Sequence, residues 1–384
     1  MATTTEENRN IPADSPRCEI LSRIPADLLR DEILSRIPAT DLFRIFRLVS
    51  RQWRRLISSP EFIQIHLKRS TADETQIRII IADPTAMTYY NYAPGATKDP
   101  RFYPYPPSSS HRYDSCPIIL GSCDGLICLY EGANQRFSVF NPSMNRYELR
   151  LADKFRWLFL TNYASWFGRN PCTGEYVLVI GSRLQGSHVD IRVYELKTHA
   201  ARKSRSIIHQ KKHGRDYKYF DPVGKFLHGA LHWAACTQPM NEPHFEKKHV
   251  IVAYDFGKNE ILEIPAPREF PFTVGVVDEC LFVIFGNAAQ VFELWTMREY
   301  GVKESWTKYA NIEGGTEGFK YTQLLVPLAF SSDRDELIVD ADRKKVVKYS
   351  FKEKKITLLK NHDSRESIAI SYVDSLVPAK VIFE

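Results

Sequence analysis

One short stretch of the chain carries the residue types of a nucleophile. Gly121–Gly125 reads GSCDG, a cysteine version of the G-x-S-x-G turn of hydrolases. That turn needs a strand before the nucleophile and a helix after it. The next residues here, LICLY, are apolar and favour a strand instead. Because Asp124-Gly125 is a preferred dipeptide of two-residue hairpin turns, the sequence predicts a hairpin here rather than an active-site cysteine.

Cysteine and histidine together suggest a metal as a second kind of chemistry. Cys116, Cys123 and Cys128 form the only local group of cysteines, and His111 lies near them. Their spacing lacks the two close pairs of a structural zinc site. The seven cysteines are odd in number and scattered, which is more typical of reduced thiols in half-buried strands.

Carboxylates alternate along two stretches near the C-terminus, at Asp333/Asp335 and Asp340/Asp342. A calcium loop would need a glycine at its bend, and none stands there, so solvated carboxylates are the simpler interpretation. No glycine-rich phosphate loop is present either. The sequence therefore predicts no metal and no cofactor.

Aromatic residues next to histidines provide a third possibility. Trp233 follows His232, and His228 lies four residues earlier, so the three could form a platform for a cation or a sugar. Trp157 and Trp166 each have an arginine nearby and leave the same question open. The alternative is that these rings fill the space between packed sheets.

Any such functional group must be positioned by a folded domain. The length of the chain predicts two domains. A chain of 384 residues exceeds one typical core, which indicates a small domain and a larger one. The longest apolar runs, Cys280–Phe285 and Leu324–Phe330, are far shorter than a membrane span. Because the first ten residues are polar, we expect no secretory signal, no membrane partner and a location in the cytoplasm, the nucleus or both.

Positive charge is concentrated in two segments. The net charge is +6, and residues 17–69 hold eleven Arg/Lys against six Asp/Glu. Residues 197–218 hold eight Lys/Arg and one acid, Asp216. Nuclear localisation or nucleic-acid contact would explain the second segment. A solvated loop is the better interpretation, because no aromatic residues are interleaved for stacking on bases, and nucleic acid is not an expected partner.

Residues 27–67 have the apolar spacing of helices. Apolar side chains recur every three or four positions, which places them on one stripe. Pro38 ends a first helix, Thr40 can cap a second, and Ser58 with Glu61 forms a capping box before a third. Three short helices bury little of their own surface, so their apolar stripes indicate a partner.

The same segment, IPADLLRDEILSRIPATDLFRIFRLVSRQWRRLISSPEFIQIHLKRS, resembles the F-box in its plant form. That motif runs Leu-Pro, a pair of leucines, Glu-Ile-Leu, a second Leu-Pro, Val-Ser-x-x-Trp and a closing Ser-Pro-x-Phe. The resemblance implies binding to a Skp-type adaptor, and through it to a cullin-RING ubiquitin ligase. The adaptor of that family is acidic, which suits the basic segment. The residues that the resemblance assigns to adaptor contact are Pro25, Leu28, Leu29, Ile33, Leu34, Pro38, Leu42, Val49 and Trp53. The alternative for some of these residues, Val49 and Trp53 especially, is that they hold the helices together.

A short phrase occurs twice at this end of the chain. ILSRIPAD at Ile20–Asp27 returns as ILSRIPAT at Ile33–Thr40, so the first Ile-Pro can begin the motif and the second copy can supply its middle helix. Six residues separate Pro25 from Glu32, where the family usually has five. One extra helical residue rotates the later part of the helix by about 100°. Either a bulge absorbs that residue or the first adaptor contacts shift.

Residues 84–117 are rich in Pro, Tyr and Ser and show no periodicity, which predicts irregular or extended chain. They are either a spacer or a long insertion between two strands. The apolar run QIRIIIAD at Gln76–Asp83 reads as a strand and favours the insertion.

Beyond Ile118, strand signals dominate and a loose repeat is visible. The markers of five successive units are 54, 60, 40 and 55 residues apart, and they are Phe140, Tyr194, Tyr254, Leu294 and Tyr349. Repeats of about 40–50 residues with several strands each are typical of propeller blades. The strand at 76–83 could complete a sixth unit with the C-terminus. We therefore expect an α+β multidomain chain, with a three-helix N-terminal module followed by an all-β, propeller-like domain of about six blades.

This region resembles the plant F-box-associated domain. The matching phrases are GSCDGLICLY, FNPSMNRYEL, GALHWAA, YDFGKNEILEIPAP, VKESWTKY and YVDSLVPAK, in the expected order. Arg169-Asn170 departs from the family, which usually has Tyr-Asp there. The resemblance implies a kelch-like propeller whose surface recognises a protein to be ubiquitinated. The phrases read as strand-and-turn framework, so they do not locate the binding site.

The predicted organisation has four parts, which are a disordered tail (1–18), F-box helices (19–70), a first strand with a linker or insertion (71–117) and a propeller-like domain (118–384). We expect a non-catalytic substrate receptor of a ubiquitin ligase with an unknown target protein. A second hypothesis is a lectin-like or scaffold propeller that is not coupled to ubiquitination. A propeller hydrolase is disfavoured, because no nucleophile, base and orienting group occur together.

Overall fold

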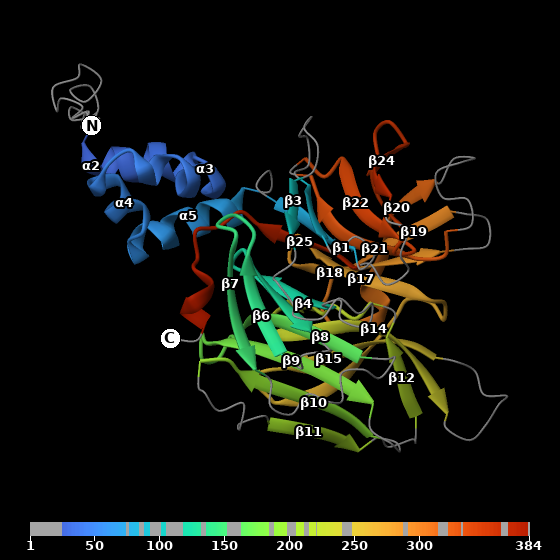
Figure 1. Ribbon diagram of the computed structural model, residues 1–384. Coiled ribbons are helices and arrows are strands. Elements are labelled where there is room, and N and C mark those ends of the chain that lie inside the picture. The colour runs from blue at the N-terminus through green and yellow to red at the C-terminus, as the bar shows by residue number, and fades with distance from the viewer. Residues whose placement is uncertain are drawn as a thin grey trace, which may run out of the picture.

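The structure is a computed structural model, and it describes sixteen segments of the chain. They are residues 25–73, 77–83, 88–92, 101–104, 118–131, 136–151, 163–183, 188–197, 205–210, 215–219, 221–239, 248–286, 291–313, 322–331, 333–361 and 368–382. Helices occupy the N-terminal part and strands nearly all the rest (Figure 1). Among the described residues, no helix has the length and apolar character that a membrane crossing requires.

The N-terminal helical module, residues 25–73, is built from short segments. They are α2 (Ala26–Leu28), η1 (Leu29–Ile33), η2 (Leu34–Arg36), α3 (Ala39–Arg44), η3 (Phe46–Leu48), α4 (Arg51–Ile57) and α5 (Pro60–Ala72). The stretch predicted as one second helix is therefore interrupted between α3 and α4. The side chain of Ser50 accepts a hydrogen bond from the Trp53 amide at 3.1 Å, which caps α4 as a new helix.

Two of the predicted helix caps are wrong. Thr40 lies inside α3, which begins at Ala39 directly after Pro38. Ser59 rather than Ser58 caps α5, because its hydroxyl accepts from the Phe62 amide at 3.2 Å. Pro60 then occupies the first helical position, where its missing N–H costs nothing.

The extra residue before Glu32 is absorbed by a π-helical turn. Segment η1 is a π-helix, and the Leu34 amide donates to the carbonyls of both Arg30 and Leu29. A bond to the fifth residue back accommodates one more residue per turn than an α-helix does. This confirms the first of the two alternatives, because the bulge removes the rotation that an uninterrupted α-helix would impose on the residues after it.

The strands of the described residues form six antiparallel sheets. In chain order, three of the sheets comprise β4 (Ile118–Cys123), β5 (Leu126–Glu131), β6 (Arg136–Asn141) and β7 (Arg146–Leu151); β8 (Tyr163–Arg169), β9 (Tyr176–Arg183), β10 (His188–Glu195) and β11 (Arg205–Gln210); and β12 (Arg215–Tyr219), β13 (Lys225–Leu227), β14 (Ala230–Pro239), β15 (Lys248–Asp255) and β16 (Glu260–Pro265). The next two comprise β17 (Phe272–Val277), β18 (Cys280–Gly286), β19 (Val291–Met297) and β20 (Trp306–Glu313), with η6 (Lys303–Ser305) before the last strand; and β21 (Leu325–Phe330), β22 (Glu336–Ala341), β23 (Lys345–Ser350) and β24 (Lys355–Asn361).

The remaining sheet joins the two ends of the chain. Its order is β25 (Ile368–Val373), β1 (Ile77–Asp83), β2 (Thr88–Tyr92) and β3 (Arg101–Pro104). The pairing of β1 with β25, in which Ile80 is opposite Ile370, confirms the prediction that the strand near residue 76 completes a unit with the C-terminus. Residues 84–117 were predicted to be irregular or extended, and the described parts are extended, since β2 and β3 add two paired strands whose tyrosines favour that structure. Residues 84–87, 93–100 and 105–117 lie outside the described residues.

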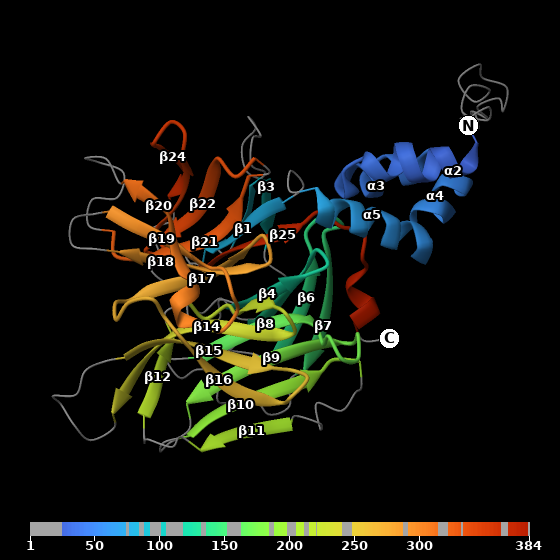
Figure 2. The same ribbon diagram turned by 180° about the vertical axis from the view of Figure 1, so that it is seen from behind.

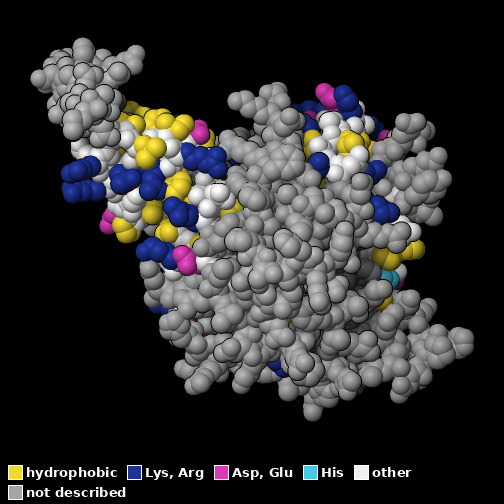
Figure 3. Space-filling model, in the orientation of Figure 1, with side chains coloured by type: hydrophobic (Ala, Val, Ile, Leu, Met, Phe, Trp, Pro, Cys, Tyr) yellow, Lys and Arg dark blue, Asp and Glu magenta, His cyan; other side chains and the backbone are white. Residues whose placement is uncertain are grey.

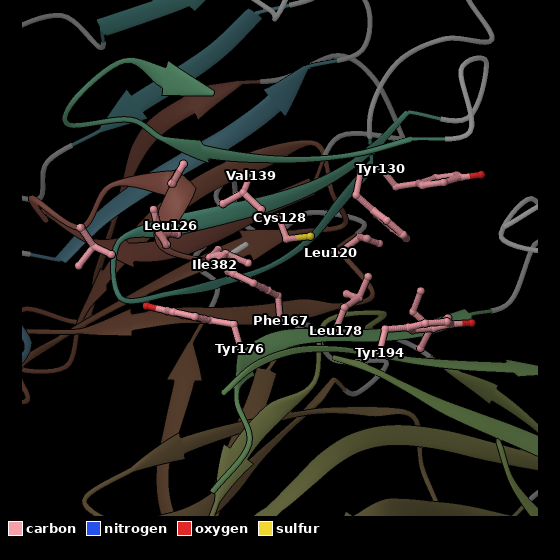
Figure 4. Packing of buried hydrophobic residues seen from close by; sticks show 14 of the residues in the cluster. Leu120, Leu126, Cys128, Tyr130, Val139, Phe167, Tyr176, Leu178, Tyr194 and Ile382 are labelled. Carbon is pink, nitrogen blue, oxygen red and sulfur yellow. The ribbon is translucent and has the colours of Figure 1, made fainter. Parts of the chain in front are cut away.

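Each sheet packs face to face with the next, and the set closes into a ring. Tyr130 and Val139 of the β4–β7 sheet share a core with Phe167 and Leu178 of the next sheet, and their side chains point toward one another in Figure 4. Similar apolar cores lie between each of the following pairs of neighbouring sheets. The sheet that contains β25 and β1 packs on the β4–β7 sheet on one side and on the β21–β24 sheet on the other. The domain is therefore a β-propeller, in which closure protects the strand edges.

The last described residues, 374–382, form what we call the C-terminal strap. It leaves β25, ends in the short helix η7 (Ala379–Ile382) and lies between the helical module and β7 in both ribbon views (Figures 1 and 2). Leu376 is buried in the core of the helical module, whereas Val377 and Ile382 belong to a propeller core that also takes in Leu67 of α5. The strap thus contributes side chains to the cores of both domains.

Buried hydrogen bonds fix the strap to the propeller. The Asn141 side-chain amide donates to the carbonyls of Ser375 and Val377 at 3.1 and 2.7 Å. Ser143 donates to Asp374 and accepts from the Ser375 amide. Because these groups are shielded from water, each bond that is removed leaves a polar group without a partner.

We expect Asn141→Ala to destabilise the protein by about 2–4 kcal/mol, because two buried carbonyls lose their donor. The measurement is the free energy of unfolding from urea titration followed by circular dichroism. The control is Asn170→Ala, since the Asn170 side chain accepts one bond from Cys172 in an exposed turn. Equal stability of the two variants would contradict the role given to Asn141.

Candidate functional site

The GSCDG stretch is a hairpin, as the sequence predicts. Cys123 ends β4, Leu126 begins β5, and Asp124 and Gly125 form the turn with positive φ angles of 53° and 79°. Burial raises the pKa of the Cys123 thiol well above its ordinary value, which keeps the thiol protonated and a poor nucleophile. The Asp124 carboxylate accepts from Arg169 Nε and from the Tyr176 hydroxyl, both at 2.6 Å, so it stabilises contact between two sheets.

The other candidates for metal chemistry do not come together. Burial also raises the pKa of the Cys128 thiol, while His111 and Cys116 lie outside the described residues. The Asp342 carboxylate accepts from the backbone amides of Gln323 and Leu324, which ties it to the preceding strand. Within the described residues, no three His, Cys, Asp or Glu side chains are grouped to hold a metal ion.

The His232–Trp233 pair fills space inside the propeller. Trp233 is 1% exposed and packs between the β8–β11 sheet and its neighbour. His232 is fully buried, contacts the Lys225 carbonyl through Nδ1 at 3.2 Å and contacts the Tyr300 hydroxyl through Nε2 at 2.7 Å. The alternative of a packing role is therefore correct for both, and no open platform forms from them. Trp166 is also largely buried, and Trp157 lies outside the described residues.

The helical module carries an exposed apolar face. Five large apolar side chains on it stand in solvent, with exposed fractions of 49% for Leu28, 43% for Ile33, 58% for Ile45, 67% for Leu48 and 58% for Val49. Yellow side chains gather on this module in Figure 3. A cluster of this kind on a small domain is typical of a protein-binding surface.

The nine residues assigned to adaptor contact fall into three groups. Exposed positions are Pro25, Leu28, Ile33, Pro38 and Val49; half-buried positions are Leu29 and Trp53; fully buried positions are Leu34 and Leu42. Leu34 and Leu42 have 0% exposure and pack in the core of the module, so in this structure they hold the helices together, and their assignment to adaptor contact stays a prediction. Trp53 packs on that core and stacks on Phe46 with a ring separation of 5.8 Å.

Ile45 and Leu48 belong to the exposed face, although neither was among the residues assigned to adaptor contact. The sequence placed Ile45 on the apolar stripe that was predicted to meet a partner and left Leu48 off it. The cause is the interruption between α3 and α4. On one continuous helix, Leu42, Ile45 and Val49 would share a stripe. The 3₁₀ turn η3 and the Ser50 cap change the direction of the chain, so Leu42 points inward while Ile45 and Val49 point outward. The signal available in the sequence was Ser50 ahead of apolar residues at helical spacing, Trp53 and Leu56, which is a helix-start pattern.

The exposed apolar face is bordered by arginines. Arg44, Arg51, Arg54 and Arg55 are exposed on α3 and α4, and blue side chains surround the yellow ones in Figure 3. Arg47 lies over the Phe43 ring at 4.2 Å. Burial lowers the pKa of the Arg47 guanidinium, and the nearby positive charges of Arg54 and Arg146 lower it further. This crowding of like charges favours an acidic partner.

The fold defines a β-propeller protein with a separate helical module, and that module has an exposed apolar and basic face. Comparison with known families agrees with this class. The F-box domain family matches residues 21–65, and the family described as F-box associated beta propeller domain matches residues 106–379. The chain belongs to this family, as an F-box protein with an F-box-associated β-propeller.

Curated relatives come from Arabidopsis thaliana. F-box protein CPR1 is 23% identical over 358 residues, covering 86% of this chain and 83% of the relative. F-box protein At4g22390 is 22% identical over 316 residues, covering 77% and 75%. Among solved structures, the crystal structure of a nidogen/laminin complex shares 8% identity with a TM-score of 0.44, covering 78% of this chain and 99% of that one.

Stability is expected to fall in acid because of His232. Burial lowers the pKa of His232 to about 4, against 6.5 for the exposed side chain. Below pH 6.5 the unfolded chain gains a proton that the folded protein does not bind until about pH 4. Stability is therefore complete above pH 6.5 and falls by about 3 kcal/mol toward pH 4.

The measurement is the free energy of unfolding between pH 7 and pH 4, for the wild type and for His232→Gln. The variant lacks the titrating group, so its stability should fall less steeply over that range, although it starts lower. The same slope in both proteins would assign the pH dependence to other groups, such as His66, whose pKa burial also lowers.

Proposed function

We propose that this protein is the substrate-recognition subunit of a Skp–cullin–F-box ubiquitin ligase. The observation that carries the proposal is the exposed apolar face of the F-box, with Ile45, Leu48 and Val49 bordered by arginines. F-box domains generally bind Skp-type adaptors, and burial of these side chains on a partner would supply the driving force. The propeller would bind the target protein.

The mechanism is one of positioning. The strap places Leu376 in the F-box core and Val377 in a propeller core, so the two domains are packed together rather than joined by a free linker. A target held on the propeller would then have a defined position relative to the adaptor and to the ubiquitin-carrying subunit. Such fixed orientation raises the effective concentration of the reacting groups.

A non-catalytic role for this chain is supported by the described side chains. Cys123 and Cys128 are buried thiols with raised pKa values, and His232 is enclosed by its neighbours. The bond-forming chemistry would belong to other subunits of the ligase. A lectin-like role would need a cluster of exposed tryptophans beside carboxylates; Trp166 and Trp233 are buried, and Trp295 is half-buried and donates to Glu293.

The test is adaptor binding by the double variant Leu48→Asp/Val49→Asp. Two charges placed in an apolar contact would have to be desolvated, so we expect affinity for purified Skp-type adaptor to fall by at least about 100-fold. Biolayer interferometry gives the dissociation constants, and circular dichroism checks that the variant is folded.

The matched control is Leu358→Asp, which changes an apolar side chain of similar exposure, 52%, on the propeller strand β24. This variant should bind the adaptor as the wild type does. Failure of the wild type to bind, or retention of binding by the double variant, would contradict the proposed function.

A further inference from the structure

The propeller has a cavity, open to solvent, where its six sheets meet. Its volume is about 250 Å³, and residues from all six sheets line it. The strands nearest the centre contribute Ser122 of β4, Trp166 of β8, Phe226 of β13, Val276 of β17, Phe330 of β21 and Ser371 of β25. The cavity is thus a product of ring closure and is separate from the F-box face.

Two pairs of aromatic rings form much of the wall. Trp166 and Phe226 stack with centroids 5.6 Å apart and planes inclined by 24°. Phe282 and Phe330 meet edge to face at 5.5 Å. Although it lies in a cavity wall, Phe226 is 40% exposed, so an apolar ring that covered it would remove further apolar area from water.

Glycines keep these rings flat against the strands. A Cβ atom on Gly275 would lie 2.2 Å from the Phe282 ring, and one on Gly168 would lie 2.1 Å from the Trp166 ring. Larger residues at these two positions would push the rings toward the centre of the ring of sheets. The glycines therefore preserve both the space and the aromatic surface.

One charged side chain lines the cavity. Lys225 is the only Lys, Arg, His, Asp or Glu among the described lining residues. Its Nζ lies 3.5 Å from Asp221 Oδ2, which is too long for a strong hydrogen bond. Asp221 is 5% exposed, and its Oδ2 has no hydrogen-bond partner among the described residues. The ammonium is balanced in charge, and this one long contact does not use up its three N–H donors.

The turns nearest the cavity carry charges that are already paired. Asp124 pairs with Arg169, and Asp278 pairs with Arg334. With Lys225 balanced by Asp221, the site has little net charge to offer an ionic ligand. A free carboxylate would leave an excess negative charge next to apolar rings, whereas a neutral carbonyl would not.

We propose that this cavity binds one aromatic side chain of the target protein, with the ring against Trp166 and Phe226 and the backbone carbonyl of the same residue accepting a hydrogen bond from Lys225. The volume suits a single large side chain better than a drug-sized molecule, for which pockets of about 300–1,000 Å³ are usual. The assignment of the occupant rests on the proposed function, because it takes the propeller to be the target-binding domain.

The test uses the full chain with small blocked amino acids as probes. N-acetyl-phenylalanine amide and N-acetyl-tryptophan amide carry the ring and the carbonyl, and N-acetyl-alanine amide lacks the ring. Saturation-transfer difference NMR with titration gives their affinities. We expect the aromatic amides to bind and the alanine amide to give no signal above background.

Three variants locate the binding. Phe226→Ala removes part of the wall and Lys225→Met removes the donor, and each should weaken binding by more than about fivefold. The control Tyr309→Ala removes an aromatic ring that is 53% exposed on β20, outside the cavity lining, and should leave binding unchanged. If Phe226→Ala does not fold, Ala329→Phe provides a second approach, since it fills the cavity without removing a wall.

Several outcomes would overturn the proposal. Equal signals from the alanine and aromatic amides, or unchanged binding in both Phe226→Ala and Lys225→Met, would show that the cavity is not the site. Tighter binding of phenylacetate than of the amides would indicate a free small acid rather than a protein side chain. Adaptor affinity measured on the same samples separates the two proposals. Phe226→Ala should leave adaptor affinity unchanged. A wild type that binds the probes but not the adaptor would contradict the proposed function alone.

Discussion

The pairing of β1 with β25 is the contact on which the rest of this structure depends. It joins residues about three hundred positions apart and completes the ring, since the sheet they form packs on the first and last of the other sheets. Closing so long a loop is entropically unfavourable, and its cost must be offset by burial of Ile79–Ile81 and Ile370 in two inter-sheet cores. Without this pairing, two sheets would expose apolar faces and strand edges.

The segment that closes the ring also connects the two domains. From β25 the chain passes directly into the strap, where Asn141 and Ser143 hold its backbone and Leu376 enters the F-box core. Ring closure and domain docking are therefore coupled through residues 368–382. At the N-terminal end of the propeller, α5 of the F-box precedes β1 directly in the chain. At the C-terminal end, the strap packs against the F-box. The F-box is therefore attached to the propeller at both ends of the propeller chain.

The surfaces available for partners differ in how they are maintained. On the F-box, apolar side chains remain exposed because the interruption after α3 directs them away from a small core that Leu34, Leu42 and Phe62 already fill. In the cavity of the propeller, Gly168 and Gly275 leave room for the rings of Trp166 and Phe282 to lie against the strands. Both features hold apolar surface next to water, as the exposed fractions of Leu48 and Phe226 show.

The sequence by itself determined the class of each domain. Helical periodicity and the F-box motif located the module, and turn-bounded strands at regular spacing predicted a propeller, because these patterns depend on local backbone geometry. The turn at Asp124-Gly125 and the one-residue excess before Glu32 were likewise visible in local sequence. Only the tertiary structure decided that Leu34 and Leu42 are buried, that Ile45 and Leu48 are exposed, and that Leu376 joins the F-box. Those outcomes depend on contacts between residues far apart in the chain, which local patterns do not encode.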